Sequence, residues 1–226
     1  MAGLLVLIDV NKVLVSDTRD VSEYVAEAIR SRYGLQPEVN VDEYEGFTAQ
    51  EMIADVLRKN GLKDDEINPR LEGCAEELGY SYYNVTGRES IEVMDGAGQL
   101  LDELGRRGAL VGIATGEVED QVKNRLHRAG LDGRIGFGSY GNRETDMKAI
   151  MSSAARLAAE RGFDRGGKIV FLGSSPKAIG AAKELGFGAI GVASGRYSKE
   201  QLKEAGADTV VSGVKERGRI LKAVFG

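Results

Sequence analysis

Residues 4–14 read Leu-Leu-Val-Leu-Ile-Asp-Val-Asn-Lys-Val-Leu, and this stretch decides the fold. The unbroken apolar run from Leu4 to Ile8 predicts a buried strand of a parallel sheet. The carboxylate that follows it, Asp9, then lies at the edge where such sheets place ligands. Asp9 is therefore a candidate nucleophile or metal ligand. The residue two positions further on is the amide Asn11 instead of a second carboxylate.

The composition is that of an ordinary globular chain with an acidic balance. Its 226 residues are 42% hydrophobic and 29% charged, and the net charge is -5. We expect no nucleic-acid partner, because phosphate backbones need a basic surface. Cys74 is the only cysteine, so no internal disulfide can form and a cytoplasmic location is expected. The long apolar run at the N-terminus is too short to cross a membrane, so no membrane partner is expected.

The pattern along the chain changes near residue 89. From about residue 18 to residue 88 it predicts helices only, one of which opens at Thr48 with a capping residue, Glu51, three positions on. Later residues alternate between short strands and helices, which is typical of an open parallel sheet. We therefore expect an α/β fold, a Rossmann-like parallel sheet with helices on both faces (residues 1–17 and 89–226), plus an inserted all-α cap (residues 18–88). The expected helices are 21–33, 48–60, 69–83, 96–104, 119–129, 146–161, 176–185, 199–205 and one from 215, and the later strands are 109–114, 168–172, 188–192 and 209–211.

Polar residues also follow two of the later strands. Thr115 and Gly116 come directly after one strand, and Ser174 comes after another. Because adjacent parallel strands end at the same edge of a sheet, we expect these residues to share one crevice with Asp9. The hydroxyl of Thr115, and backbone N–H groups where Gly116 opens a helix, suit an anionic oxygen. A nucleophilic carboxylate beside such a phosphate cradle suggests phosphoryl transfer through an aspartyl-phosphate.

Taken in order, these motifs resemble those of the haloacid dehalogenase-like (HAD) hydrolase superfamily, in the phosphatase branch with a helical cap inserted after the first strand. The resemblance covers nearly the whole chain. It implies a Mg²⁺-dependent phosphatase of small phosphate esters, with a small phosphate or another anion as ligand. The regions that carry it are 4–17, 93–132, 137–141 with the helix from Asp146, 169–186, 191–198 and 205–208.

The departures from the family pattern fall on the residues that carry the chemistry. The resemblance makes Asp9 the nucleophile, whereas Asn11 replaces the second Asp, which acts as general acid and base. An amide cannot donate and recover a proton near neutral pH. The acidic positions that hold Mg²⁺ in the family correspond to Ser174 and Ala178. Asp9 is thus the one remaining carboxylate ligand, and we expect it to hold Mg²⁺ poorly.

Three further charged positions bear on ligand binding. The resemblance makes Lys148 the phosphate-binding basic residue of the third motif, although a shift of one residue would put Met147 there. Glu117 stands where an amide is common, and a carboxylate there would repel a phosphate. Lys12 either places an ammonium as a tethered cation for Asp9 or is an ordinary surface lysine.

The helix predicted at 119–129 carries a group of basic residues. We expect the histidine of this group, His127, to lie on a solvated face outside the site. The residues are Lys123, Arg125, His127 and Arg128.

Two classes of function remain open. Acid/base and metal positions are lost together, which favours an HAD-like protein that is impaired or inactive as a phosphatase and binds a small anion or another protein. The alternative is a genuine hydrolase, phosphatase or dehalogenase-like, with an altered mechanism. In that case a carboxylate such as Glu117, Glu144 or Asp146 would enter the crevice from a loop. Mg²⁺ is expected as a cofactor if the protein is active, and no cofactor otherwise.

Overall fold

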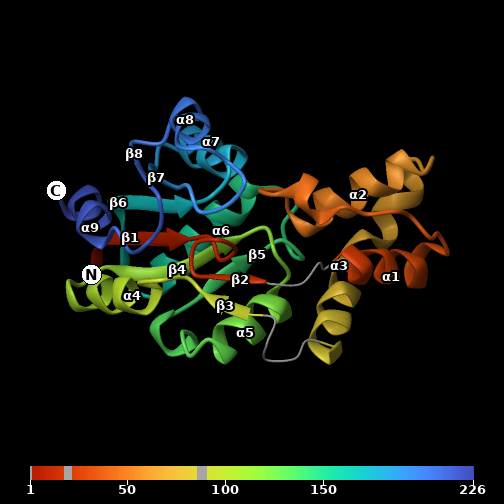
Figure 1. Ribbon diagram of the computed structural model, residues 1–226, viewed down its shortest axis with the longest axis horizontal. Helices are drawn as coiled ribbons and strands as arrows, with labels where there is room; N and C mark the ends of the chain where they lie inside the picture. Colours follow the sequence, from red (N-terminus) through yellow and green to blue (C-terminus); the bar gives the residue numbers. More distant parts are fainter. Residues whose placement is uncertain (1, 18–21, 86–90) are drawn as a thin grey trace.

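The computed structural model describes residues 2–17, 22–85 and 91–226. Its larger part is a parallel sheet with the strand order β5-β4-β1-β6-β7-β8 (Figure 1). The apolar run at the N-terminus forms β1, between β4 and β6, and its residues Leu5 to Ile8 are fully buried. A central strand covered on both faces requires such a continuous apolar run. The strands are β1 (Ala2–Ile8), β4 (Leu110–Thr115), β5 (Gly138–Tyr140), β6 (Phe163–Gly173), β7 (Gly188–Val192) and β8 (Thr209–Val211).

Helices cover both faces of this sheet, as predicted. One face packs against α4 (Ala97–Arg106), α5 (Glu119–Arg128) and α9 (Arg217–Phe225). The other face packs against α6 (Met147–Glu160), α7 (Pro176–Glu184) and α8 (Lys199–Glu204). Successive side chains of β1 alternate between the two apolar clusters, because strand side chains point to opposite faces in turn. The predicted Rossmann-like α/β fold is confirmed.

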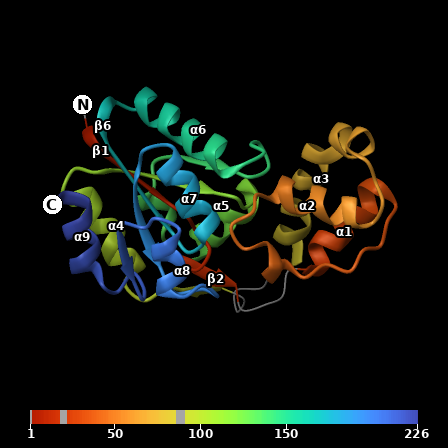
Figure 2. The same cartoon turned by 90° about the horizontal axis from the view of Figure 1, so that it is seen from above.

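A group of helices, here called the helical cap (residues 22–85), lies beyond the carboxyl ends of the strands (Figures 1 and 2). It contains α1 (Ser22–Tyr33), the 3-10 helix η1 (Val41–Tyr44), α2 (Ala49–Lys59) and α3 (Asp64–Val85). These helices pack around an apolar cluster that includes Ile29, Ile53 and Ile67. The predicted domain boundaries, 17/18 and 88/89, fall at residues 18–21 and 86–90, outside the described residues. That division therefore stays a prediction.

Three details differ from the sequence-based expectation. Strand β5 was not among the expected strands. Strands β2 (Val15–Asp17) and β3 (Ile91–Val93) form an antiparallel pair that was not expected, because each has only three residues and neither is a continuous apolar run. Helix α3 begins at Asp64, ahead of Pro69, because its acidic first turn complements the positive end of the helix dipole. None of the helices in the described part of the chain is long and apolar enough to span a membrane.

Candidate active site

Asp9 directly follows β1 and is buried, with 9% of its surface exposed. Its Oδ1 accepts hydrogen bonds from Thr115 Oγ1 at 2.7 Å and from the backbone N–H of Val10 at 2.8 Å. Its Oδ2 accepts no hydrogen bond from any residue that the structure describes. Burial, followed by the negative charge of Glu117, raises the pKa of Asp9 to about 7. Asp9 therefore ionises near neutral pH.

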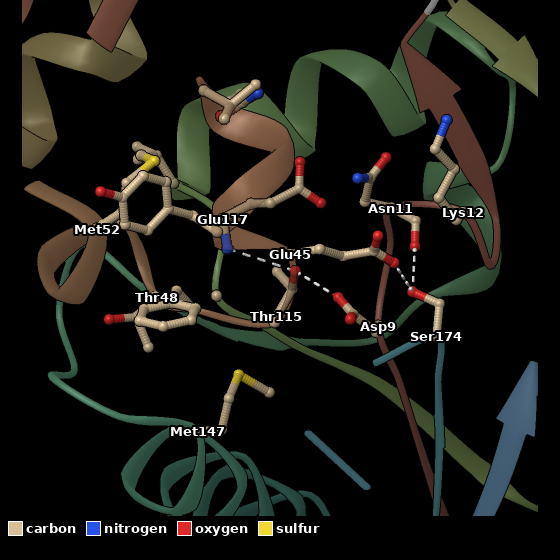
Figure 3. A pocket seen from close by; sticks show the side chains of 18 of the residues that line it. Asp9, Asn11, Lys12, Glu45, Thr48, Met52, Thr115, Glu117, Met147 and Ser174 are labelled. Atoms are coloured by element: carbon tan, nitrogen blue, oxygen red, sulfur yellow. Dashed lines mark hydrogen bonds between the residues drawn. The ribbon is translucent and has the colours of Figure 1, made fainter. Parts of the chain in front are cut away.

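A pocket of about 200 Å³ lies between the strand ends and the helical cap (Figure 3). The structure brings together in its lining five of the residues singled out from the sequence. The cap contributes several apolar side chains to the opposite wall, including Met52. The five residues are Asp9, Asn11, Thr115, Gly116 and Ser174.

The amide of Asn11 faces a buried guanidinium. Arg125 on α5 has 1% of its side chain exposed, forms an ion pair with Glu117 and donates from Nη2 to Asn11 Oδ1 at 3.3 Å. Arg125 is buried because it shares a helical face with Val122, which packs into the core. His127, by contrast, has 78% of its side chain exposed, as expected.

A carboxylate from the cap reaches the end of β6. The hydroxyl of Ser174, itself 3% exposed, lies 3.2 Å from Glu45 Oε1 and 3.3 Å from the backbone oxygen of Asn11. The Ser174 hydroxyl is the donor in both contacts, so its proton is shared between the Glu45 carboxylate and the backbone oxygen of Asn11. Burial raises the pKa of Glu45, and the hydrogen bond from the Ser174 hydroxyl opposes this shift. Glu45 was not foreseen from the sequence, because it lies between η1 and α2 with no motif around it.

The main chain of the cap lies directly against Gly116. The backbone N–H of Ala49 donates to the Gly116 carbonyl at 2.7 Å. A Cβ atom at position 116 would lie 2.2 Å from the carbonyl oxygen of Phe47, so this close approach requires glycine. Helix α5 begins only at Glu119, so Gly116 does not open a helix as expected. The carbonyl of Gly116 thus contacts the cap, and an anion-binding role of its N–H stays a prediction.

Two residues that the resemblance placed in the site lie outside the pocket. The side chain of Lys148 is 52% exposed, and its Nζ pairs with Glu184 of α7 at 2.8 Å. Its neighbour Met147 is buried and lines the pocket, so of the two positions considered for the third motif only Met147 reaches the pocket. A helix turns by about 100° per residue, so the two side chains point in different directions. Ala178 is fully buried in the apolar cluster beneath α7.

Lys12 lines the pocket but does not act as a cation for Asp9. Its ammonium donates to Ser16 Oγ at 2.6 Å. Its φ of 62° is the one positive value at a non-glycine residue in the described ranges. Such a conformation costs on the order of 1 kcal/mol and is typical of functional turns.

Of the loop carboxylates considered from the sequence, only Glu117 lines the pocket. Glu144 accepts a hydrogen bond from Ser153, and Asp146 caps α6 by accepting from the backbone N–H of Ala149. Neither of these two carboxylates lies where it could supply the carboxyl group that is missing at position 11.

The side chains around Asp9 do not provide the oxygen ligands of the Mg²⁺ site that the resemblance implies. Mg²⁺ requires octahedral oxygen coordination that includes one or two protein carboxylates. Within residues 2–17, 22–85 and 91–226, no group of three or more Asp, Glu, His or Cys side chains is arranged to hold a metal ion. Ser174 is neutral, and Ala178 lies in the core. Glu45 is already hydrogen-bonded to Ser174.

Comparisons with known proteins agree with the fold. A model of the haloacid dehalogenase-like hydrolase family matches residues 4–186. A phosphoglycolate phosphatase of Vibrio cholerae serotype O1 is 24% identical over 228 residues, which cover 98% of this chain and 96% of the relative. The crystal structure of a hydrolase from Pseudomonas syringae aligns with a TM-score of 0.71 at 19% identity, covering 99% of this chain and 100% of the other. A predicted phosphoglycolate phosphatase from Haemophilus somnus 129pt aligns with a TM-score of 0.68 at 19% identity, covering 98% of both chains. At these identities the structural likeness shows the fold alone.

Proposed function

The chain belongs to the haloacid dehalogenase-like hydrolase family, and we propose that it is a member whose metal-dependent phosphatase chemistry is impaired or absent. The observation that carries this proposal is the surroundings of Asn11. The position next to Asp9 that should hold a proton-transferring carboxyl holds an amide, and its oxygen accepts a hydrogen bond from Arg125. An amide in this place can orient neighbouring groups, but it cannot protonate a leaving group.

The charges around Asp9 support the same proposal. Metal-dependent phosphoryl transfer needs an ionised nucleophile and a cation that neutralises the phosphate. Here burial holds the pKa of Asp9 near 7, and Glu117 adds a negative charge to the same wall. Met147 faces the pocket at the position expected for a basic residue. The two cations of the lining, Lys12 and Arg125, are hydrogen-bonded to other residues, so the pocket offers little free positive charge to a phosphate dianion.

A second candidate function, a hydrolase with an altered mechanism, is favoured by one observation. Glu45 places a carboxyl with a raised pKa in the same pocket as Asp9. A raised pKa makes a carboxyl better suited to act as a general acid. Under this alternative, Glu45 takes the role that Asn11 cannot perform, and its hydrogen bond to Ser174 fixes its position.

A titration with Mg²⁺ tests the preferred function. We expect neither saturable heat by calorimetry nor a rise in melting temperature that depends on Mg²⁺ up to about 10 mM, because a bound ion would stabilise the folded state by mass action. A saturable Mg²⁺ signal that Asp9→Asn removes would overturn the proposal. If the protein instead hydrolyses a phosphate ester, loss of turnover in Glu45→Gln but not in Glu43→Gln would support the second candidate.

We also infer a cytoplasmic location, which is supported by cysteine usage. The single cysteine, Cys74, is buried in the helical cap, and a chain built for an oxidising compartment would more often carry paired cysteines.

A further inference from the structure

We propose that the pocket binds a small organic ammonium ligand, whose cationic head lies between Asp9 and Glu45 and whose apolar body lies against the helical cap. The proposal rests on the function proposed above, because a working phosphatase would need the same space for a phosphate dianion. It names a ligand class opposite in charge to the anion that the sequence predicts.

The charge of the pocket lining favours a cationic ligand. Of the basic residues in it, Lys12 donates its ammonium to Ser16, and Arg125 is engaged by Glu117 and the amide of Asn11. The acidic residues outnumber the basic ones, so an anionic ligand would enter against a net negative charge. The acidic lining residues are Asp9, Asp42, Glu45 and Glu117, and the basic ones are Lys12 and Arg125.

One oxygen of Asp9 is open to the cavity. The Asp9 side chain is buried and lines the pocket, and its Oδ2 accepts no hydrogen bond from the described residues. An ammonium in the cavity would supply this oxygen with both a hydrogen-bond donor and the opposite charge. Glu45 reaches toward the same region from the cap (Figure 3), and its charge contributes to raising the pKa of Asp9, so the two carboxyl groups interact. A cation between them relieves that repulsion.

The lining of the pocket suits an organic cation better than a metal ion. The structure offers two carboxyl groups there, and no cluster of three or more acidic, histidine or cysteine side chains among the described residues could hold a metal. The opposite wall is apolar and includes the rings of Tyr44 and Phe47, which meet edge to face with centroids 5.4 Å apart. A pocket with an acidic end and an apolar end matches an amine that carries a short apolar body. A volume of about 200 Å³ lies below the range of drug-sized sites, which limits that body to one ring or a short chain.

A matched set of benzyl compounds tests this proposal on the intact chain. Benzylamine, which is protonated at pH 7.5, is titrated against the ¹⁵N-labelled protein and followed by ¹H–¹⁵N NMR, alongside benzyl alcohol and benzyl phosphate. We expect benzylamine to bind with a Kd of about 1 mM or below and at least about tenfold more tightly than the alcohol or the phosphate. The shifted amides should include those of Val10, Ala49 and Gly116.

Variants locate the charge that recognises the amine. Asp9→Asn and Glu45→Gln should each weaken benzylamine binding about tenfold, because each removes one charged partner. Glu43→Gln is the matched control, because Glu43 is exposed on the same cap segment and does not line this pocket. Its affinity for benzylamine should not change.

Equal affinities for benzylamine and benzyl alcohol would overturn the proposal, and so would equal affinities in wild type, Asp9→Asn and Glu45→Gln. If MgCl₂ displaced benzylamine from the pocket in a saturable way, the proposal would also be overturned, in favour of a metal ion. The two proposals fail separately. Mg²⁺-dependent hydrolysis of benzyl phosphate would overturn the proposed function, whereas no hydrolysis together with no benzylamine binding would overturn the ammonium site alone.

Discussion

The guanidinium of Arg125 forms an ion pair with the carboxylate of Glu117 on the wall of the pocket, and Arg125 is almost completely buried there. The same guanidinium donates to Asn11, so one buried cation connects two positions that the sequence marks as departures from the family pattern. Arg125 therefore compensates the charge of Glu117 and orients the amide of Asn11. Because both polar partners surround it, the cost of burying Arg125 is offset by charge-assisted hydrogen bonds.

Removing this cation should destabilise the fold. Arg125→Met leaves Glu117 without its ion-pair partner, and we expect the free energy of unfolding to fall by about 3 kcal/mol. The double variant Arg125→Met with Glu117→Gln should be the more stable of the two, because no uncompensated charge remains. Urea denaturation measures both. Lys123→Met, an exposed position on the same helix, should change stability by no more than about 0.5 kcal/mol. A loss equally small in Arg125→Met would contradict the structural role of the pair.

The raised pKa of Asp9 predicts a stability profile with a defined sign. The folded protein holds the proton of Asp9 more tightly than the unfolded chain does, since the pKa of Asp9 rises from 3.8 to about 7 on folding. This proton therefore adds on the order of 4 kcal/mol to the free energy of unfolding below about pH 4, and the addition is lost as the pH rises through about 7.

Asp9→Asn keeps an acceptor oxygen but removes this titration. The variant should therefore be more stable than wild type at pH 8, with the difference shrinking toward pH 4. Denaturation in urea across this pH range tests the expectation, with Asp65→Asn, an exposed position, as the control. Parallel profiles for wild type and Asp9→Asn would show that Asp9 does not titrate as described.

A single methyl group at position 116 should disturb the contact between cap and core. Gly116→Ala brings Cβ into the carbonyl of Phe47, and we expect a loss of about 1–3 kcal/mol together with faster amide exchange at Ala49. Gly105→Ala in α4 meets no atom within 4 Å and should stabilise the protein slightly through helix propensity. Unchanged exchange at Ala49 would mean that the cap does not depend on this approach.

The sheet and most helices could be predicted because their signals are local. The run Leu5 to Ile8 is buried on both faces, and Thr48 with Glu51 forms the predicted capping box at the start of α2. Register on a helix was harder to predict, since one residue decides whether Lys148 or Met147 faces the pocket. Their neighbours in the sequence do not settle that choice, and the packing of α6 against the sheet does.

The two residues that the sequence reading missed depend on tertiary structure in different ways. Arg125 carries a readable signal, because it lies three residues after Val122 and seven after Val118, both of which are buried. A charge on an otherwise apolar helical face could have marked it as buried and paired. Glu45 carries no such signal, because only the folding of the cap over the strand ends brings it to Ser174.

We propose that Asp9 does not support metal-dependent phosphoryl transfer. The initial rate of p-nitrophenyl phosphate hydrolysis tests this proposal most directly. The rate is measured for wild type and Asp9→Asn, with and without Mg²⁺, from pH 5 to pH 9. We predict that wild type and Asp9→Asn hydrolyse the ester at the same background rate under every condition. A rate that requires Mg²⁺ in the wild type and disappears in Asp9→Asn would contradict the claim.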